Sequence, residues 1–481
     1  MSISSYAAMD FETYDEILDI VDQNIIASLL KMSGLFLMFI VISFVLRKIN
    51  NDRMIIAICS ILVIVLAQVW IKFNVYPPIV DQYAVWSSAE ILANGNILDE
   101  AHQQYLKMCP HQIGMITCMK FIMDVCNSTN VMIWREFNVI CLAMTLIGMS
   151  MIAKDISSKS EAASLTAIIF ILFCPAIFYT SYVYGTTSSI AFVTWSIYGT
   201  IKFCKYDSKN YVILPIILLP IANLLYQSTY VADIAVILTL IFFDKCSVKK
   251  LAICILIIFL CIGLNVMSKH IFFETTNIEI KKGIPASAYI YMGITSNNFD
   301  GINMRLYKEN DENTEKTSAT AWNLIHQTLN EYATGERSIK FFIEKMQYQW
   351  TDPFFSAIIM TCYPTTPEFK NNNLQVSELF SDFMNGKLIR LLQELLISYL
   401  SLVYAMAIIA ALYAMFKDIN SSMKIIALYF IGGFIFQIFW ETKARYCFSY
   451  FIYLIPLASC SINLIVEKIK EKIFLHKTLT I

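Results

Sequence analysis

The sequence predicts an all-α polytopic membrane protein, and three observations support this fold class. Hydrophobic residues make up 57% of the 481 residues, whereas charged residues make up only 15%. Long apolar runs follow one another along the chain, and a helix that crosses a bilayer core of roughly 30 Å needs about 20 such residues. The basic residues between the runs alternate in a way that fits repeated crossing of a membrane.

The apolar runs are the expected membrane helices, about 11 in number. They lie at 26–46, 54–73, 131–153, 162–182, 186–203, 211–226, 229–243, 251–268, 389–416, 423–440 and 446–466. Pro215 and Pro220 interrupt the pair 211–226 and 229–243, so the pair fits either one broken helix or two short spans. Two spans keep the neighbouring lysines on one side, and we therefore predict two.

The basic loops orient these spans. If every run crosses once, six basic clusters fall on one side of the membrane: Arg47/Lys48/Arg53, Lys154/Lys159, Lys202/Lys205/Lys209, Lys245/Lys249/Lys250, Lys417/Lys424 and Lys468/Lys470/Lys472. By the positive-inside rule this side is cytoplasmic. The C-terminus then lies in the cytoplasm, and the N-terminus and segments 74–130 and 269–388 lie outside.

Three parts follow from this topology. Residues 1–268 form an N-terminal transmembrane module that includes the external loop 74–130, residues 269–388 form an extracytoplasmic domain, and residues 389–481 form a C-terminal transmembrane module with a basic tail. Apolar residues recur at helical spacing in 322–332 and 339–346, so we expect two amphipathic helices there that pack on each other. The run 113–126 is too short to span and predicts an interfacial helix on the outer face.

Composition narrows the functional classes. The net charge of −1 is spread over the loops, which excludes a nucleic-acid-binding surface. Most of the 13 cysteines lie in apolar runs and the sequence has no CxxC or Cys/His metal spacing, so we expect neither a disulfide framework nor a metal site. A disulfide among the cysteines expected outside remains an alternative (Cys109, Cys118, Cys126, Cys362). The N-terminus is acidic and lacks the basic region of a cleavable signal peptide (Asp10, Glu12, Asp15, Glu16, Asp19, Asp22).

The first candidate functional residue is Asp81, which follows Tyr76-Pro77-Pro78 and precedes a helical pattern. One interpretation is structural: aspartate is among the best N-cap residues, so Asp81 would cap the next helix. The other interpretation is a general base at the membrane surface, where partial burial tunes a carboxylate. The remaining acids of the loop are interpreted as surface charge (Glu90, Asp99, Glu100).

Further candidates are His111 and Arg445, each expected near the outer face. His111 is either a hydrogen-bonded structural group or a contact to a lipid phosphate. Arg445 is either an interfacial cation or a fork that binds phosphate with two hydrogen bonds, oriented by Glu441. Arg135 and Glu136 are expected to form a polar rim at the outer end of their helix. Aromatic residues near the outer ends fit an aromatic belt or a sugar-binding surface.

Several short motifs, spread over nearly the whole chain, carry a family resemblance. They are Asp81 after its prolines, Tyr105 with Pro110-His111-Gln112-Ile113-Gly114, Tyr184-Gly185, Tyr291-Met292-Gly293, Gln349-Trp350-Thr351-Asp352-Pro353, and Glu441 with Ala444-Arg445-Tyr446. In this order and sidedness they resemble the GT-C class of polytopic glycosyltransferases, in particular the bacterial family 39 enzymes that are similar to protein O-mannosyltransferases.

The resemblance implies transfer of a sugar from a polyprenyl-phosphate donor to an envelope glycan, lipid or protein acceptor at the outer face of a bacterial cell membrane. Asp81 would then be the catalytic base, and Arg445 and His111 would bind the donor phosphate, supported by Gln112, Glu441 and Tyr184. The chain departs from the family pattern in an extra first span and in Gln82, which stands where a second acid follows in eukaryotic relatives. These departures leave the acceptor and any divalent cation requirement open.

Other functional classes fit the same organisation. A polysaccharide polymerase or ligase also combines many spans with a long external loop, and would rely on Arg and His rather than an early Asp. A flippase of lipid-linked sugars would use broken helices such as 211–243, although it is expected to have repeated halves, and the sequence has no repeat. A non-catalytic membrane scaffold is the remaining alternative.

Overall fold

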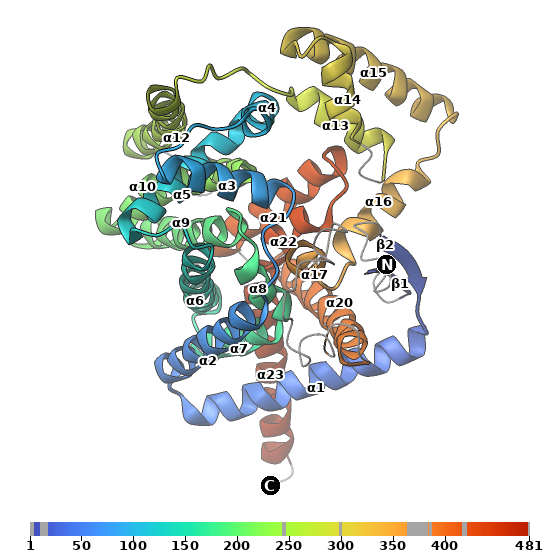
Figure 1. Cartoon of the computed structure of the whole chain (residues 1–481). Helices are drawn as coiled ribbons and strands as arrows, with labels where there is room; N and C mark the ends of the chain where they lie inside the picture. The colour runs from blue at the N-terminus through green and yellow to red at the C-terminus, as the bar shows by residue number, and fades with distance from the viewer. Residues whose placement is uncertain are drawn as a thin grey trace.

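The computed structural model describes residues 4–9, 18–242, 247–297, 301–362, 383, 387–415 and 421–479, which are almost entirely helical (Figure 1). All of the apolar runs form helices within these ranges. Some residues used for the topology prediction lie outside them: Asp10, Glu12, Asp15 and Glu16 of the acidic N-terminus, and the basic-loop residues Lys245 and Lys417.

Nine of the apolar runs correspond to one helix each. These helices are α1 (Ile25–Ile49), α2 (Asp52–Phe73), α6 (Met132–Ser157), α9 (Thr186–Tyr206), α10 (Lys209–Leu225), α11 (Tyr230–Phe242), α12 (Val248–Thr276), α20 (Lys387–Met415) and α21 (Ser421–Phe439). The region 211–243 is therefore two helices, joined by the 3-10 turn η3 (Gln227–Thr229).

Two apolar runs are bent rather than straight. Residues 162–182 form α7 (Ser160–Leu172), α8 (Cys174–Phe178) and η2 (Tyr179–Ser181), with a bend of 66° at the break. Pro175 stands in the first turn of α8, where its missing N–H costs nothing but where it ends α7. The last run forms α22 (Ala444–Phe451) and α23 (Leu454–Leu479), bent by 46°.

The chain is a multi-pass membrane protein. Six helices of the described residues are long and apolar enough to cross a bilayer, and the number rises to eight if each bent pair is one span. The helices α1 and α12 expose most of their apolar surface: only 11% and 28% of their most apolar stretches are buried by the rest of the protein. Apolar side chains left outside a protein core at this length require a lipid environment.

The interior of the helix bundle contains small polar side chains that bond across helices. The hydroxyls of Thr166 and Ser459 join α7 to α23, and those of Thr194 and Tyr453 join α9 to α23 at 2.9 Å. In a bilayer such bonds and close packing replace the hydrophobic effect as the cause of helix association. α23 therefore lies in the interior of the bundle, against α6, α7 and α20.

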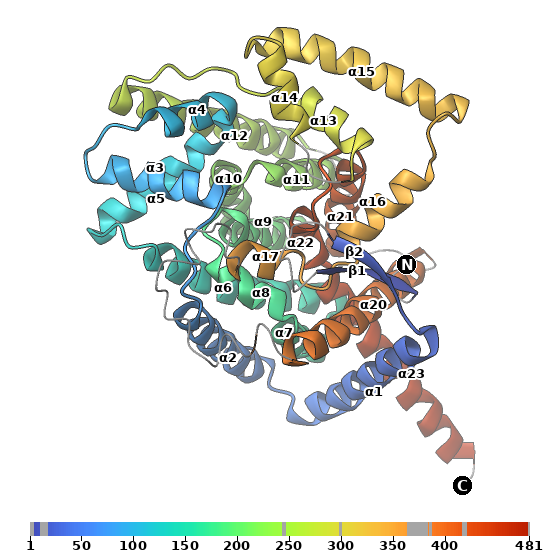
Figure 2. The same ribbon diagram turned by 45° about the vertical axis from the view of Figure 1, so that its right-hand side comes forward.

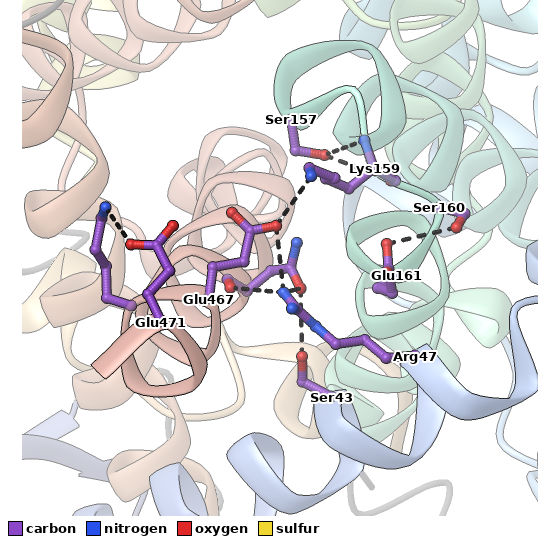
Figure 3. A network of polar contacts seen from close by, with 10 residues as sticks. Ser43, Arg47, Ser157, Lys159, Ser160, Glu161, Glu467 and Glu471 are labelled. Atoms are coloured by element: carbon purple, nitrogen blue, oxygen red, sulfur yellow. Dashed lines mark hydrogen bonds and ion pairs between the residues drawn. The ribbon is translucent and has the colours of Figure 1, made fainter. Parts of the chain in front are cut away.

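Basic residues of four loops gather at one end of the bundle, here called the lysine end: Arg47, Lys154, Lys159, Lys202, Lys205 and Lys249. Each pairs with a carboxylate from another element, and Glu467 of α23 accepts from both Arg47 at 3.4 Å and Lys159 at 3.2 Å (Figure 3). Asp155 pairs with Lys202 at 2.8 Å. The pairing brings the ends of α1, α6, α7, α9 and α23 together, as repeated crossing requires.

Shorter helices gather at the opposite end of α6. They are α3 (Asp81–Ala93), α4 (Glu100–Met108), η1 (Pro110–Gln112) and α5 (Ile113–Cys126), followed later in the chain by α13 (Ala286–Thr295), α14 (Ile302–Glu309), α15 (Thr314–Thr334), α16 (Lys340–Trp350) and α17 (Ala357–Cys362). Arg135 and Lys154 of α6 are 19 residues apart, a rise of roughly 28 Å, so the two ends are separated by about one bilayer core.

Segment 269–388 contains the two predicted amphipathic helices, α15 and α16. α13, α14 and α15 share a small core of their own (Ile284, Ala288, Leu306, Tyr307, Ala321) and lie together at one edge of the molecule in both views (Figures 1 and 2). α15 and α16 meet at their junction, where the rings of Tyr332 and Phe342 are 5.1 Å apart. The main partners of α16 are instead α22 and an N-terminal hairpin.

That hairpin is the one departure from an all-helical chain within the described residues. β1 (Ser5–Met9) and β2 (Leu18–Asp22) pair antiparallel, and the backbone N–H of Ala7 donates to the hydroxyl of Thr351 at 2.8 Å. The sequence analysis did not predict these strands. The segment is acidic, and strand formation there depends on tertiary contact with α16 rather than on a local pattern.

Candidate functional site

Asp81 is the first residue of α3, and its side chain does not cap that helix. The N-cap is Val80, which makes no side-chain capping bond, so the N-cap interpretation of Asp81 is wrong. Val80 has φ 48° and ψ −123°, and Gln82 donates its N–H to the carbonyl of Ile79 at 3.0 Å. This is a type II′ turn with a β-branched residue where glycine is favoured, a strained conformation that leaves the Asp81 carboxylate unused by the backbone.

The Asp81 carboxylate lies between a phenol and a guanidinium. Tyr105 of α4 donates its hydroxyl to Oδ1 at 3.3 Å, and Nη2 of Arg445 lies 3.9 Å from Oδ2. The Asp81 side chain is 36% exposed and that of Arg445 is 11% exposed. The distance is longer than a charge-assisted hydrogen bond, which is about 2.7–2.9 Å, so the two charges face each other without a close contact.

Two buried polar side chains fix the backbone around Asp81. Gln82 donates to the carbonyl of Met360 at 2.8 Å and accepts the N–H of Val183 at 2.9 Å. Arg135, which is 3% exposed, donates to the carbonyls of Asn74 at 2.6 Å and Tyr76. The expectation that Arg135 forms a polar rim is therefore wrong: its guanidinium is inside, holding the loop that leads to Asp81, because those carbonyls have no helix to bond to.

His111 and Gln112 lie in η1, beside Asp81. The Gln112 amide nitrogen donates to the hydroxyl of Tyr184 and contacts Nε2 of His111 at 3.1 Å. Burial lowers the pKa of His111 to about 4, with opposing contributions from Asp81, which raises it, and Lys269, which lowers it. His111 is therefore a neutral imidazole at pH 7, so a contact to a phosphate would be that of a neutral donor. It can still donate a hydrogen bond through Nδ1.

Phenols surround the carboxylate on the remaining sides. Burial raises the pKa values of Tyr105, Tyr184 and Tyr289 well above the usual range, and the negative charge of Asp81 adds to the effect in all three. They remain protonated at physiological pH and act as neutral hydrogen-bond donors. Tyr184 and Tyr226 are in edge contact, with ring centroids 6.0 Å apart.

Glu441 lies in the turn between α21 and α22, and Arg445 lies in the first turn of α22. Nη1 of Arg445 contacts Sδ of Met360 at 3.1 Å, and its guanidinium lies over the ring of Tyr446 at 5.2 Å. The Tyr446 hydroxyl donates to Glu441 at 3.0 Å, so Glu441 orients the ring on which Arg445 rests. The sequence placed Glu441 beside Arg445 correctly, although the contact runs through Tyr446.

The α13–α15 unit is fastened over this end by backbone contacts. The N–H of Ile284 donates to the carbonyl of Met108 at 3.0 Å, directly after the site helix α4. Gly283 has φ +72°, and a Cβ there would lie 2.3 Å from Pro110, so the close approach requires glycine. Tyr289 stacks on Trp440 with ring centroids 5.1 Å apart, which continues the aromatic wall from α13 to the turn that bears Glu441.

Lys345 of α16 is a fully buried amine that supports the same turn. Its ammonium nitrogen donates to the carbonyls of Gly293 and Trp440, and burial lowers its pKa to about 7. Gly293 belongs to the motif Tyr291-Met292-Gly293, and a Cβ there would lie 2.4 Å from the carbonyls of Phe439 and Trp440. Lys345 thus ties α13 and α16 to the segment that carries Glu441.

Four residues of this end escaped the sequence analysis: Gln82, Lys269, Tyr289 and Lys345. Lys345 and Lys269 look like surface lysines in a sequence, and their burial or proximity depends on how α12, α13 and α16 dock. Gln82 had a signal, because a glutamine directly after Asp81 was noted as a departure from the acidic pair; its role as a backbone clamp explains why an uncharged amide suits this buried position.

The described residues contain no group of three or more His, Cys, Asp or Glu side chains that could hold a metal ion. Cys109, Cys118, Cys126 and Cys362 are free thiols. The chemistry available at Asp81 is consequently that of one carboxylate base, one arginine and several neutral hydrogen-bond donors. A scan against protein-family models found no match to the chain, and a search of curated protein sequences found no significant relative.

Proposed function

We propose that this protein is a membrane glycosyltransferase that moves a sugar from a polyprenyl-phosphate donor to an envelope glycan, lipid or protein acceptor. The observation that carries the proposal is a partly exposed carboxylate, Asp81, that caps no helix and faces a partly buried arginine at 3.9 Å. Carboxylates and arginines at the lysine end, by contrast, are directly paired. A base held beside a fixed positive charge suits a reaction that removes a proton and expels a phosphate.

The steps follow from the charges. Asp81 accepts the proton of the acceptor hydroxyl while the hydroxyl oxygen bonds to the anomeric carbon of the sugar. The bond between that carbon and the phosphate oxygen breaks, and polyprenyl phosphate leaves with the electron pair. Arg445 offsets the charge of the phosphate, and the neutral His111 contributes a hydrogen bond through Nδ1. Tyr105, Tyr184 and Tyr289 supply donors for sugar oxygens.

We further propose that the chain crosses the membrane about 11 times, with the lysine end in the cytoplasm and Asp81 outside. What supports this orientation is the gathering of Lys154, Lys159, Lys202 and Lys205 at one end, since basic loops are retained in the cytoplasm. The short helices around Asp81 would then rest on the outer surface of a bacterial cell membrane, where lipid-linked donors present their sugars.

The test uses the full-length protein in inverted and right-side-out membrane vesicles, supplied with polyprenyl phosphate carrying a tritiated hexose or pentose. We expect label to pass into a lipid-extracted or precipitable acceptor in right-side-out vesicles. Nucleotide sugars serve as the matched control and should give no direct transfer. The proposal would be contradicted if no lipid-linked sugar is transferred, or if transfer is unchanged in Asp81→Asn. If the protein joins preformed lipid-linked oligosaccharides but transfers no monosaccharide, it is a polymerase or ligase instead.

A further inference from the structure

A second polar arrangement joins α3 to α4, one helix turn from the Tyr105–Asp81 contact. Nε2 of His102 lies 2.7 Å from Oγ of Ser87, and Nδ1 lies 2.7 Å from Oδ1 of Asp99. His102 and Ser87 are buried, whereas Asp99 is the N-cap of α4 and also accepts the backbone N–H of His102 at 2.9 Å. Asp99 is exposed, as expected of a surface charge, and in addition it caps α4 and binds His102.

The hydroxyl of Ser87 lies 2.7 Å from Nε2 of His102 and 2.5 Å from the carbonyl of Tyr83. Ser87, His102 and Asp99 therefore form a continuous chain of hydrogen bonds from α3 to the N-cap of α4. The hydrogen bonds from His102 also lower the pKa of Asp99.

The same three residue types form the relay of serine hydrolases, but the surroundings differ here. Ser87 lies in the middle of α3, where the neighbouring backbone N–H groups are used by helical bonds and none is available for an oxyanion. Its side chain is buried, and its hydrogen is given to Tyr83. The arrangement is therefore suited to holding two helices together rather than to nucleophilic attack.

We propose that His102 positions Tyr105 against Asp81 by clasping the first turn of α4 to α3. This inference rests on the proposed function of Asp81. Tyr105 follows His102 by three residues, on the same face of α4. The other end of α4 is already fixed, because Gln104 donates to Glu312 at 2.7 Å and Met108 accepts from Ile284 at 3.0 Å. The clasp is thus the contact that sets how α4 meets α3.

The charged groups around the clasp are few. From α3, the ring of Tyr83 lies 6.3 Å from that of His102, and Glu90 is turned away to Thr129 at 3.3 Å. Of the charged residues of α4, Glu100 is exposed and Lys107 lies beyond Tyr105. Asp99 is therefore the carboxylate in contact with His102 in the described chain.

Two variants of the full-length protein in native-like lipid discs test the clasp: His102→Gln, and His270→Gln as the control, because His270 is exposed on α12. Hydrogen–deuterium exchange of the peptide that covers α4 should speed up about tenfold in His102→Gln and stay unchanged in His270→Gln. Equal exchange in both variants would overturn the proposal.

The activity readout separates positioning from general damage. With the tritiated polyprenyl-phosphate sugar, His102→Gln should lower kcat about tenfold with KM changed less than twofold. Ser87→Ala, a smaller change, should shift kcat in the same direction if His102→Gln does not fold. Labelling of Ser87 by a fluorophosphonate would contradict the clasp. If the wild type transfers no sugar, the proposed function fails while the exchange measurement still decides the clasp.

Discussion

The two ends of the helix bundle carry similar residue types and use them differently. At the lysine end, Glu467 accepts from both Arg47 and Lys159 (Figure 3). Asp155 accepts from Lys202 at 2.8 Å. At the other end, Nη2 of Arg445 lies 3.9 Å from Oδ2 of Asp81, whose other oxygen accepts from Tyr105 at 3.3 Å. The Asp81 side chain is 36% exposed, so its carboxylate stays accessible to another molecule.

Positive φ values occur at both ends of the bundle, in different settings. At the lysine end, Asn50, Ser158 and Asp207 are left-handed C-caps of α1, α6 and α9, which is a common way for a helix to end. The Asp81 end contains a strained turn at Val80, a β-branched residue, and a pair of positive φ values at Phe355 and Ser356. Strain of this kind costs about 1–3 kcal/mol per residue and persists when surrounding contacts enforce it. Here Gln82 and Arg135 supply such contacts.

Apart from replacement of Asp81 itself, the largest effect is expected from the guanidinium that faces it. Arg445→Ala should lower sugar transfer about 100-fold or more, because a preorganised charge on the leaving phosphate is worth roughly 3 kcal/mol. Arg445→Lys should recover only part, since an ammonium lacks the planar fork. The control is Arg337→Ala, an arginine paired with Glu331 at 3.3 Å in the outer unit. Equal activities of Arg445→Ala and Arg337→Ala would remove Arg445 from the mechanism.

A smaller effect, on stability rather than on sugar transfer, is expected from the buried side chain of Arg135. Arg135→Leu leaves the carbonyls of Asn74 and Tyr76 without their donor, which should lower the free energy of unfolding by about 3 kcal/mol. Thermal unfolding in detergent measures the change. Lys120→Leu, which removes an exposed pair with Asp124, is the control and should unfold at nearly the wild-type temperature. A wild-type melting temperature for Arg135→Leu would show that the hydrogen bonds of Arg135 do not stabilise the fold.

The pH dependence of stability should reveal the neutral His111. Its pKa is lowered to about 4 in the folded protein, so below its ordinary value of 6.5 the unfolded chain takes up a proton that the folded chain does not. Stability should therefore fall as the pH drops from 6.5 towards 4, by about 2 kcal/mol at pH 5.

Asp352 has the opposite effect on stability, because burial raises its pKa to about 6 and its protonation favours the folded protein as the pH falls. The effect of His111 is therefore measured by comparing the wild type with His111→Gln, in which Asp352 is unchanged. The variant should lose less stability than the wild type between pH 7 and pH 5 in thermal unfolding. An identical loss in both proteins would mean that His111 is protonated in the folded state.

The smallest effect is expected at the lysine end. Glu467→Gln removes two ion pairs that lie at the surface of the bundle, where such pairs contribute about 0–1 kcal/mol each. Melting temperature should fall by a few degrees at most, and transfer should stay at the wild-type rate. Glu471→Gln, which removes an exposed pair with Lys468, is the matched control. A loss of transfer in Glu467→Gln alone would show that the two ends are coupled.

The sequence predicted the helices well because their signal is local. Runs such as 54–73 and 131–153 must be helical in a bilayer whatever they contact, and α2 and α6 begin and end within a few residues of those runs. The limits of helix 113–126 were predicted as observed. The bend after Leu172 was missed although the sequence carries a signal for it, because Pro175 stands three residues further on and a proline ends a helix.

The candidate site was predictable only in part, since its geometry depends on segments far apart in the sequence. The structure brings Asp81, His111, Gln112, Tyr184, Glu441 and Arg445 to the same end of the bundle. Their individual states could not be read from the sequence: the turn at Val80 decides that Asp81 is no cap, burial decides that His111 is neutral, and the docking of α4 on α3 brings His102 to Ser87.

One measurement tests the contrast between the ends most directly: Asp81→Asn and Asp155→Asn compared for sugar transfer in membranes and for thermal unfolding. Asp81→Asn should lose about 10²- to 10⁴-fold of the transfer rate and keep its melting temperature, because the carboxylate is a base and no cap. Asp155→Asn should keep its specific activity and unfold at a lower temperature, because it breaks the pair with Lys202. The reverse pattern, or unchanged transfer in Asp81→Asn, would contradict the assignment of the Asp81 end as the site of chemistry.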